Sequence, residues 1–264
     1  MTSTISRIAP LALAAALAAS AALPAAAQAP DPEAIVRAAR DYQGASSMQA
    51  RLVMRLVDRK GATSERMLDE YMIREQGLSR SMTVFQKPAS VQGTRFLVVE
   101  KAGGESDRWI FLPSLGKTRR IAGAEGDASF MGSDLSYDDL SPHDASKDRH
   151  AILREEERGG EACWVIESSA KDAADSQYSR VVAWISREKS VVVRMEMYDK
   201  KGALRKTLDA SKIEKVDGQW VSRVVRVETP PDKTSTTLEM TIVQFGRKIP
   251  AGVFTTKFLE TGAP

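Results

Sequence analysis

The sequence predicts a mainly β fold, an antiparallel meander of roughly ten or eleven strands. Three observations predict it: apolar and polar residues alternate over most of the chain, turn signals separate the alternating runs, and no helical pattern recurs between them. The third observation disfavours a parallel α/β sheet, because parallel strands need crossover helices.

Alternation is clearest at the first predicted strand, where Met48, Leu52, Met54 and Leu56 occupy every second position with polar residues between most of them. Turn signals then stand at 58–61, 76–77, 103–104, 114–116, 159–160, 187–190, 199–202, 217–218 and 230–233. Because a strongly twisted sheet of this many strands does not stay flat, we expect it to curl and to present a concave face.

One helix is predicted ahead of the strands, from Asp31 to Gly44. Asp31 suits the cap, Pro32 the first turn, and Gly44 the end. Its apolar stripe consists of Ile35, Val36, Ala39 and Tyr42.

Residues 1–27 are typical of a secretory signal peptide, with an early Arg7, an Ala- and Leu-rich apolar run, and small residues near Ala27 and Ala29 where cleavage is expected. An uncleaved anchor is the alternative, although the run is short for a membrane span. Residues 28–264 are then expected to form a single periplasmic domain, which we expect to be a monomer.

Composition argues against a nucleic-acid-binding protein and against a fold held by disulfides. The 38 basic and 35 acidic residues are well mixed, unlike the basic stripe of a nucleic-acid-binding protein. Cys163 is the single cysteine, so no internal disulfide is possible, and its apolar strand context predicts a buried hydrophobic side chain rather than a nucleophile.

The predicted inward positions are rich in methionine. Besides the first strand, Met195 and Met197 alternate with polar residues, as do Leu238, Met240 and Ile242 further along. Methionine adapts to variable apolar shapes, so these residues could line a pocket or simply fill a core. The pattern alone leaves both open.

A long glycine-punctuated insert, residues 108–140, interrupts the strands. It holds no Ser-His-Asp set and no phosphate-binding loop, and long ordered loops of this kind often shape a binding surface. Phe130 and Met131 precede a glycine that permits a sharp turn, which is typical of a loop folded back across an apolar opening.

The insert and the residues after it also contain Asp134, Asp138, Asp139, His143, Asp144 and His150. A metal site or a catalytic carboxylate pair is one hypothesis. The favoured one is structural: Ser136 to Asp139 resembles a capping box, and neighbouring acids on a helical turn point apart. Lys117, Arg119 and Arg120 form a small basic cluster, either a solvated strand end or a contact for a headgroup or partner.

Several motifs together resemble the LolA-like family of outer membrane lipoprotein-sorting proteins. They are Gly93–Leu97, Trp109–Pro113 with Gly116, Lys117 and Arg119–Ile121, Phe130–Asp134 with Tyr137–Leu140, and, more weakly, 217–220, 236–239 and 249–254. The central block differs from LolA proper and resembles a divergent branch linked to RND-type exporters.

The resemblance implies an incomplete antiparallel β-barrel of about eleven strands with helices covering a concave apolar face. It implies a non-enzymatic carrier without cofactor or metal, which binds acyl chains of a lipid or lipoprotein and works between an RND-type inner-membrane transporter and an outer-membrane acceptor. The expected cavity or lid residues are Met48, Leu52, Met54, Leu56, Trp109, Phe111, Phe130, Met131, Leu135, Tyr137, Met195, Met197 and Met240. The expected partner or headgroup contacts are Lys117, Arg119 and Arg120. An RseB-like sensor is the alternative, and a hydrolase a remote one.

Overall fold

Thirteen antiparallel strands form one sheet in the part of the chain that the computed structural model describes, which is residue 1 and residues 30–40, 45–103 and 106–264. The predicted signal peptide, Tyr42 and Gly44 lie outside the described residues. The strands are β1 (Ser47–Val57), β2 (Thr63–Glu75), β3 (Leu78–Lys87), β4 (Arg95–Val99), β5 (Asp107–Leu112), β6 (Lys117–Arg120), β7 (Asp148–Arg158), β8 (Glu161–Ala170), β9 (Arg180–Ser186), β10 (Val192–Tyr198), β11 (Leu204–Val216), β12 (Gln219–Thr229) and β13 (Thr234–Phe245).

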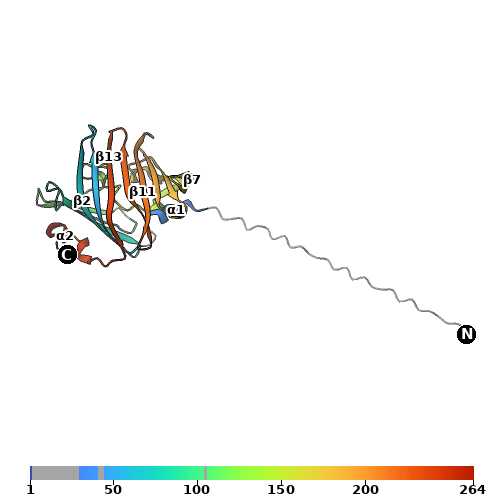
Figure 1. Ribbon diagram of the computed structural model, residues 1–264, viewed down its shortest axis with the longest axis horizontal. Helices are drawn as coiled ribbons and strands as arrows, with labels where there is room; N and C mark the ends of the chain where they lie inside the picture. Colours follow the sequence, from blue (N-terminus) through green and yellow to red (C-terminus); the bar gives the residue numbers. More distant parts are fainter. Residues whose placement is uncertain (2–29, 41–44, 104–105) are drawn as a thin grey trace. The chain divides into compact units, whose positions relative to one another are not determined.

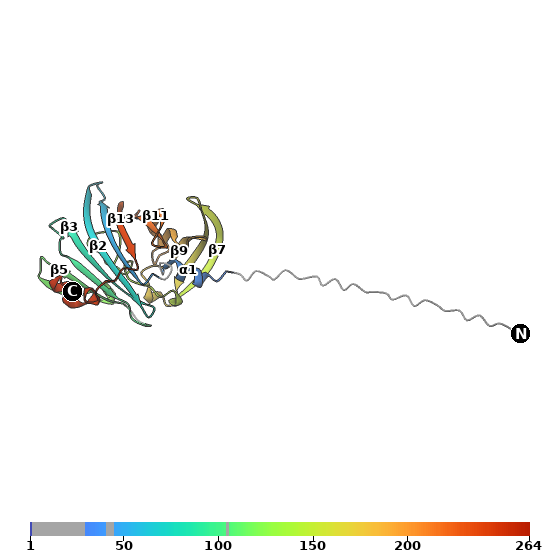
Figure 2. The ribbon, with the colours of Figure 1, turned by 60° about the horizontal axis from the view of Figure 1, so that its bottom comes forward.

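The sheet consists of two meanders joined at β1 and β13. Its order is β6-β5-β4-β3-β2-β1-β13-β12-β11-β10-β9-β8-β7, so β6 and β7 are the two edges and do not pair with each other. Figure 1 labels strands of both meanders, and Figure 2 shows the sheet curving from β5 on one side to β7 on the other. The mainly β, incompletely closed architecture predicted from the sequence is confirmed, with thirteen strands where about eleven were expected.

Helix α1 (Pro32–Arg40) lies on the concave side of the sheet near one edge. Its Val36 packs against Ile166 and Ile185 of β8 and β9. The backbone N–H of Glu33 donates to Asp31 Oδ1 at 3.0 Å, which confirms the predicted cap.

Helix α2 (Thr256–Thr261) and the 3₁₀ turn η5 (Ala251–Phe254) lie on the outer face instead, and Figure 2 shows the C-terminal end of the chain beside β5. Phe258 and Leu259 pack there against Met82 and Leu97. The reason is in the strands: β3 and β4 carry large apolar residues on both faces, so the outer face of this half also needs a cover.

A β-bulge in β13 changes the side to which one predicted inward residue points. Arg51 pairs with Ile242 but Leu52 pairs with Met240, so Thr241 is the extra residue. Met240 therefore faces inward, while the Ile242 residue is 52% exposed on the outer face. The prediction that Ile242 faces inward was wrong, because an alternation count cannot detect the extra residue.

Neither α-helix of the described residues has the length and apolar character that spanning a bilayer requires. Cys163 is completely buried, as its strand pattern predicted.

Replacing Leu259 with Ala should test the outer cover. Leu259 is fully buried, so its truncation should lower the free energy of unfolding by about 3 kcal/mol. Urea unfolding measures the change, and Glu260→Ala, an exposed neighbour, should shift it by less than about 0.5 kcal/mol. Equal stability of the two variants would show that α2 does not pack on the sheet.

Candidate functional site: a cavity on the concave face

The segment of residues 121–147, here called the crossing segment, joins β6 to β7. Since these strands are opposite edges of the sheet, their connection has to span the sheet, and it does so across the concave face. It contains two 3₁₀ turns, η2 (Gly123–Glu125) and η3 (Ala145–Lys147). Most of the insert at residues 108–140 therefore belongs to the connection that the strand order requires between β6 and β7.

Aromatic rings fix the first part of the crossing segment to the sheet. Phe130 packs against Phe85 of β3 and Phe96 of β4 at centroid distances of 5.8 and 5.1 Å, and against Tyr137 at 5.7 Å. Only 1% of Phe130 is exposed. Phe130 is thus a core residue as well as part of the cavity wall.

A tight turn follows Phe130. Met131 and Gly132 have φ values of 53° and 76°, in the left-handed region that glycine tolerates and other residues rarely adopt. Arg66 of β2 donates from Nη1 to the Met131 carbonyl oxygen at 2.7 Å, which holds the turn against the sheet.

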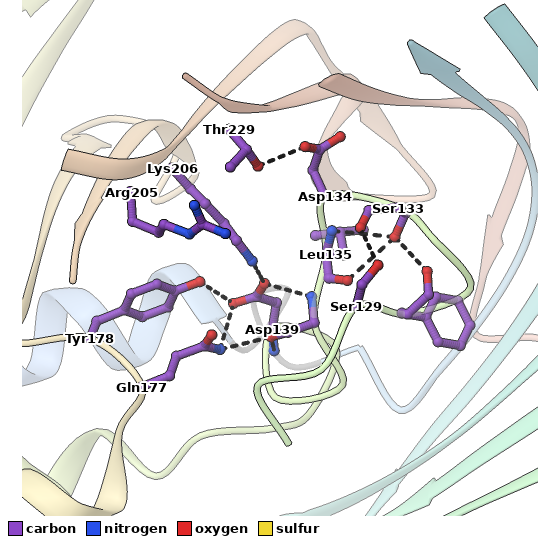
Figure 3. Close-up of polar contacts among 12 residues, drawn as sticks. Ser129, Ser133, Asp134, Leu135, Asp139, Gln177, Tyr178, Arg205, Lys206 and Thr229 are labelled. Atoms are coloured by element: carbon purple, nitrogen blue, oxygen red, sulfur yellow. Dashed lines mark hydrogen bonds and ion pairs between the residues drawn. The ribbon is translucent and has the colours of Figure 1, made fainter. Parts of the chain in front are cut away.

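Three aspartates of the crossing segment hold it to the sheet through their carboxylates, and each such contact is here called a clasp. Asp134 forms the first. Its Oδ1 accepts from the hydroxyls of Thr229 (2.6 Å) and Thr234, and its Oδ2 accepts from Thr236 at 2.7 Å. These threonines belong to the end of the β12–β13 hairpin, and Figure 3 shows Thr229 beside Asp134. The carboxylate is buried, and its hydroxyl donors offset the cost of that burial.

Asp139 forms the second clasp, toward the other half of the sheet. Lys206 Nζ of β11 lies 2.6 Å from Asp139 Oδ2, and the Tyr178 hydroxyl donates to Oδ1 at 2.8 Å (Figure 3). Ser136 and Asp139 also exchange hydrogen bonds, N–H to Oδ2 at 2.8 Å and N–H to Oγ at 3.1 Å. The predicted capping-box contacts are confirmed, although they close a turn rather than open an α-helix.

Asp138 forms the third clasp with Arg108 of β5, whose side chain is only 5% exposed. Close approach is required here, because a Cβ on Gly126 would lie 2.2 Å from Asp138 Oδ1. The two histidines are engaged elsewhere, His143 with Asp148 and His150 with Ser168. Among the described residues no group of three or more His, Cys, Asp or Glu side chains is placed to hold a metal ion.

A cavity of about 1290 Å³ lies between the crossing segment, α1 and the concave face. Its wall includes apolar side chains from both meanders: Met48, Leu52, Met54, Leu68, Met72, Val181, Met195, Met197, Leu208, Val225, Leu238 and Met240. Such a space exceeds the roughly 300–1,000 Å³ typical of pockets for drug-sized ligands.

Eight of the sequence-predicted residues line this cavity, namely Met48, Leu52, Met54, Phe130, Leu135, Met195, Met197 and Met240. Leu56, Tyr137 and Met131 belong to or pack against the neighbouring core cluster instead. The structure thus brings the methionines of distant strands to one wall. A ligand role for any of these residues stays a prediction.

Trp109 and Phe111 do not lie in the cavity. On β5 it is Arg108 and Ile110 that point inward, so the alternate residues Trp109 and Phe111 pack on the outer face in the cluster beneath η5 and α2. Their placement corrects the expectation that they contact a ligand in the cavity.

The basic cluster lies at the β6 edge, outside the cavity wall. Arg119 pairs with Glu125 and Arg120 pairs with Asp107, and Lys117 is exposed. The carboxylates neutralise two of the three cations, and a headgroup or partner contact at this edge stays a prediction.

Sequence reasoning missed a polar group in the cavity wall, Glu70 of β2. Burial raises the pKa of Glu70 to about 7, although the Thr83 hydroxyl, which donates to its Oε2 at 2.5 Å, acts in the opposite direction. The period-two alternation could have predicted this position, because Glu70 stands between Leu68 and Met72, which both face inward.

Replacing Asp134 with Ala should loosen the crossing segment. The change leaves the buried hydroxyls of Thr229 and Thr236 and the half-buried hydroxyl of Thr234 without their acceptor, which should cost about 2–3 kcal/mol of stability. Hydrogen exchange of residues 129–136 should become markedly faster. Asp127→Ala removes an exposed acid of the same segment and serves as the control; equal exchange in both variants would contradict the clasp.

Replacing Glu70 with Gln should change the pH dependence of stability. Between about pH 4.5 and 7 the folded protein keeps the Glu70 proton that the unfolded chain releases, so the wild-type protein loses stability as pH rises through this interval. The variant should lack this loss and gain roughly 2 kcal/mol over wild type between pH 4.5 and 8, allowing for cavity water. Urea unfolding at both pH values measures it, and Glu75→Gln on the same strand should show no such gain.

Comparisons with known proteins agree with this architecture. A family model described as an uncharacterized protein matches residues 77–261. The structure of a DUF1329 family protein from Desulfovibrio piger is 29% identical with a TM-score of 0.82, covering 87% of this chain and 100% of its own. No curated protein matches the sequence.

Two further solved structures share the fold. An outer membrane lipoprotein-sorting protein domain from Vibrio parahaemolyticus is 26% identical with a TM-score of 0.81, covering 87% of this chain and 98% of its own. A LolA superfamily protein from Nitrosomonas europaea, at 18% identity and a TM-score of 0.68, covers 86% of this chain and 98% of its own and shows the fold alone. The chain therefore belongs to a divergent branch of the LolA-like, outer membrane lipoprotein-sorting family.

Proposed function

We propose that this protein is a periplasmic carrier that shields the acyl chains of a lipid or lipoprotein on their way to the outer membrane. One observation carries the proposal: the cavity of about 1290 Å³ whose wall is formed by flexible apolar side chains of both meanders. Methionine, which contributes six of the lining residues named above, adapts its shape to different chains.

The driving force is burial of apolar surface, at about 0.8 kcal/mol for each methylene removed from water. A long chain bound in this way dissociates slowly from the cavity into water. Loading and release therefore need membrane partners, an RND-type transporter on the inner membrane and an acceptor on the outer membrane.

A binding role is also supported by the state of the polar residues near the cavity. The acids that first suggested catalysis, Asp134, Asp138 and Asp139, each hold the crossing segment to a different strand or hairpin. Their carboxylates are occupied by protein donors and point apart, so they do not converge on one ligand atom.

Replacing Met240 with Asp should weaken the binding of a fluorescent fatty acid. A carboxylate in the apolar wall repels the chain and its acid headgroup, so we expect a loss of affinity of at least tenfold, about 1.4 kcal/mol. Met240 is a cleaner probe than Phe130, because Phe130 also belongs to the aromatic core.

The bulge in β13 supplies the matched control. Ile242→Asp places the same charge two residues away on the outer face, where it should leave affinity unchanged. Lipid that co-purifies with the wild-type protein should be visible by native mass spectrometry. A wild-type protein that is reproducibly empty and takes up no fatty acid would overturn the proposed function.

A further inference from the structure

Glu70 interrupts the apolar wall of the cavity. On the inward face of β2 it stands between Leu68 and Met72, both of which line the cavity. Across the neighbouring strands it is paired with Ala50 of β1 and Thr83 of β3. The carboxyl group thus lies within the row of side chains that faces the cavity, well away from the loops at the ends of the sheet.

Within the part of the chain that the structure describes, a single group forms a hydrogen bond with this carboxyl group. Thr83 Oγ1 donates to Oε2 at 2.5 Å, whereas Oε1 accepts no hydrogen bond from any described residue. Oε1 is not completely buried, and the Glu70 side chain lines the cavity. One oxygen is therefore held by Thr83, and the other is open to the cavity.

Two cations of the same face have other partners. Arg108 is paired with Asp138, and Arg66 donates to the Met131 carbonyl oxygen. Arg74 lies four residues further along β2, and no ion pair joins it to Glu70 among the described residues. Among the described residues, no cation forms an ion pair or hydrogen bond with the Glu70 carboxylate.

An acid in such surroundings lacks a positive partner that a ligand can supply. A carboxylate in an apolar wall is costly unless a donor reaches it, and an ammonium group both donates and supplies the opposite charge. A carboxylate or phosphate headgroup would instead meet an acid. The wall beside Glu70 supplies the remaining requirement, a surface for a hydrocarbon chain.

We propose that Glu70, oriented by Thr83, binds the amino group of a cationic amphiphile whose chain occupies the apolar wall. The inference rests on the proposed function, since it names the headgroup chemistry of the cargo held in that cavity. Glu70 is the group that contacts the ligand, and Thr83 is a positioning residue that fixes Oε2 and leaves Oε1 for the amine.

Three probes of equal chain length test the proposal: dodecylamine, dodecanol and dodecanoate, each displacing a fluorescent fatty acid from the purified protein at pH 7.5. Wild type should bind dodecylamine at least tenfold more tightly than dodecanoate. Glu70→Gln should bind dodecylamine at least tenfold more weakly than wild type does, with its affinity for dodecanol unchanged. Glu75→Gln, an exposed acid on the same strand, should behave as wild type.

A second measurement does not depend on the variant folding. In the wild-type protein, carbon NMR of the Glu70 carboxyl group should show its titration moving to lower pH on addition of dodecylamine, and not on addition of dodecanol. Thr83→Val should weaken dodecylamine binding without changing dodecanol binding.

The outcomes separate the two proposals. If Glu70→Gln binds dodecylamine as wild type does, or if the Glu70 titration does not respond to the amine, the headgroup assignment is wrong. Binding of dodecanol by wild type in that case leaves the carrier function intact. If none of the three probes binds to wild type, the carrier function and the headgroup assignment both fail.

Discussion

The backbone pairing of β1 with β13 is the interaction on which the other features depend. It joins a meander of β1–β6 to a meander of β7–β13, and because each meander then grows away from this seam, β6 and β7 become the two edges. Chain neighbours in sequence are thereby separated by the whole width of the sheet, and their connection has to cross the concave face. The cavity is the space left between that connection and the sheet, with the methionines of β1, β10 and β13 on its wall.

The crossing segment is held by charge as much as by apolar packing. Asp138 reaches the first meander at Arg108, while Asp134 and Asp139 reach the second at the β12–β13 hairpin and at Lys206. A desolvated carboxylate destabilises a fold unless hydrogen-bond donors contact it. Each aspartate is therefore stable only at the place where its donors lie, which fixes the position of the crossing segment. A loop without regular secondary structure can in this way keep one conformation over a ligand-sized space.

Much of the fold could be predicted because period-two alternation reports directly on sheet faces. The count of about eleven strands fell short of thirteen because the breaks at residues 88–94 and 171–179 lack the paired-glycine and Asp-Gly signals that marked other turns. The inward methionines of β1 and β10 were predictable for the same reason. Trp109, Phe111 and Ile242 were not: β5 is apolar on both faces, and the bulge at Thr241 reverses the side on which Ile242 points. Contacts such as Asp134 with Thr236 join residues about a hundred positions apart, and no local pattern specifies them.

The absence of pairing between β6 and β7 has a mechanical consequence. A closed barrel has a circumference fixed by its ring of backbone hydrogen bonds, whereas an open sheet can flatten or tighten without breaking any of them. In this chain the crossing segment connects the two edges and limits that bending. The span of the open sheet, and with it the size of the cavity, is set by side-chain contacts such as Asp138 with Arg108 and Asp139 with Lys206. The size of the cavity can consequently change through a few substitutions in the crossing segment, while the sheet itself stays the same.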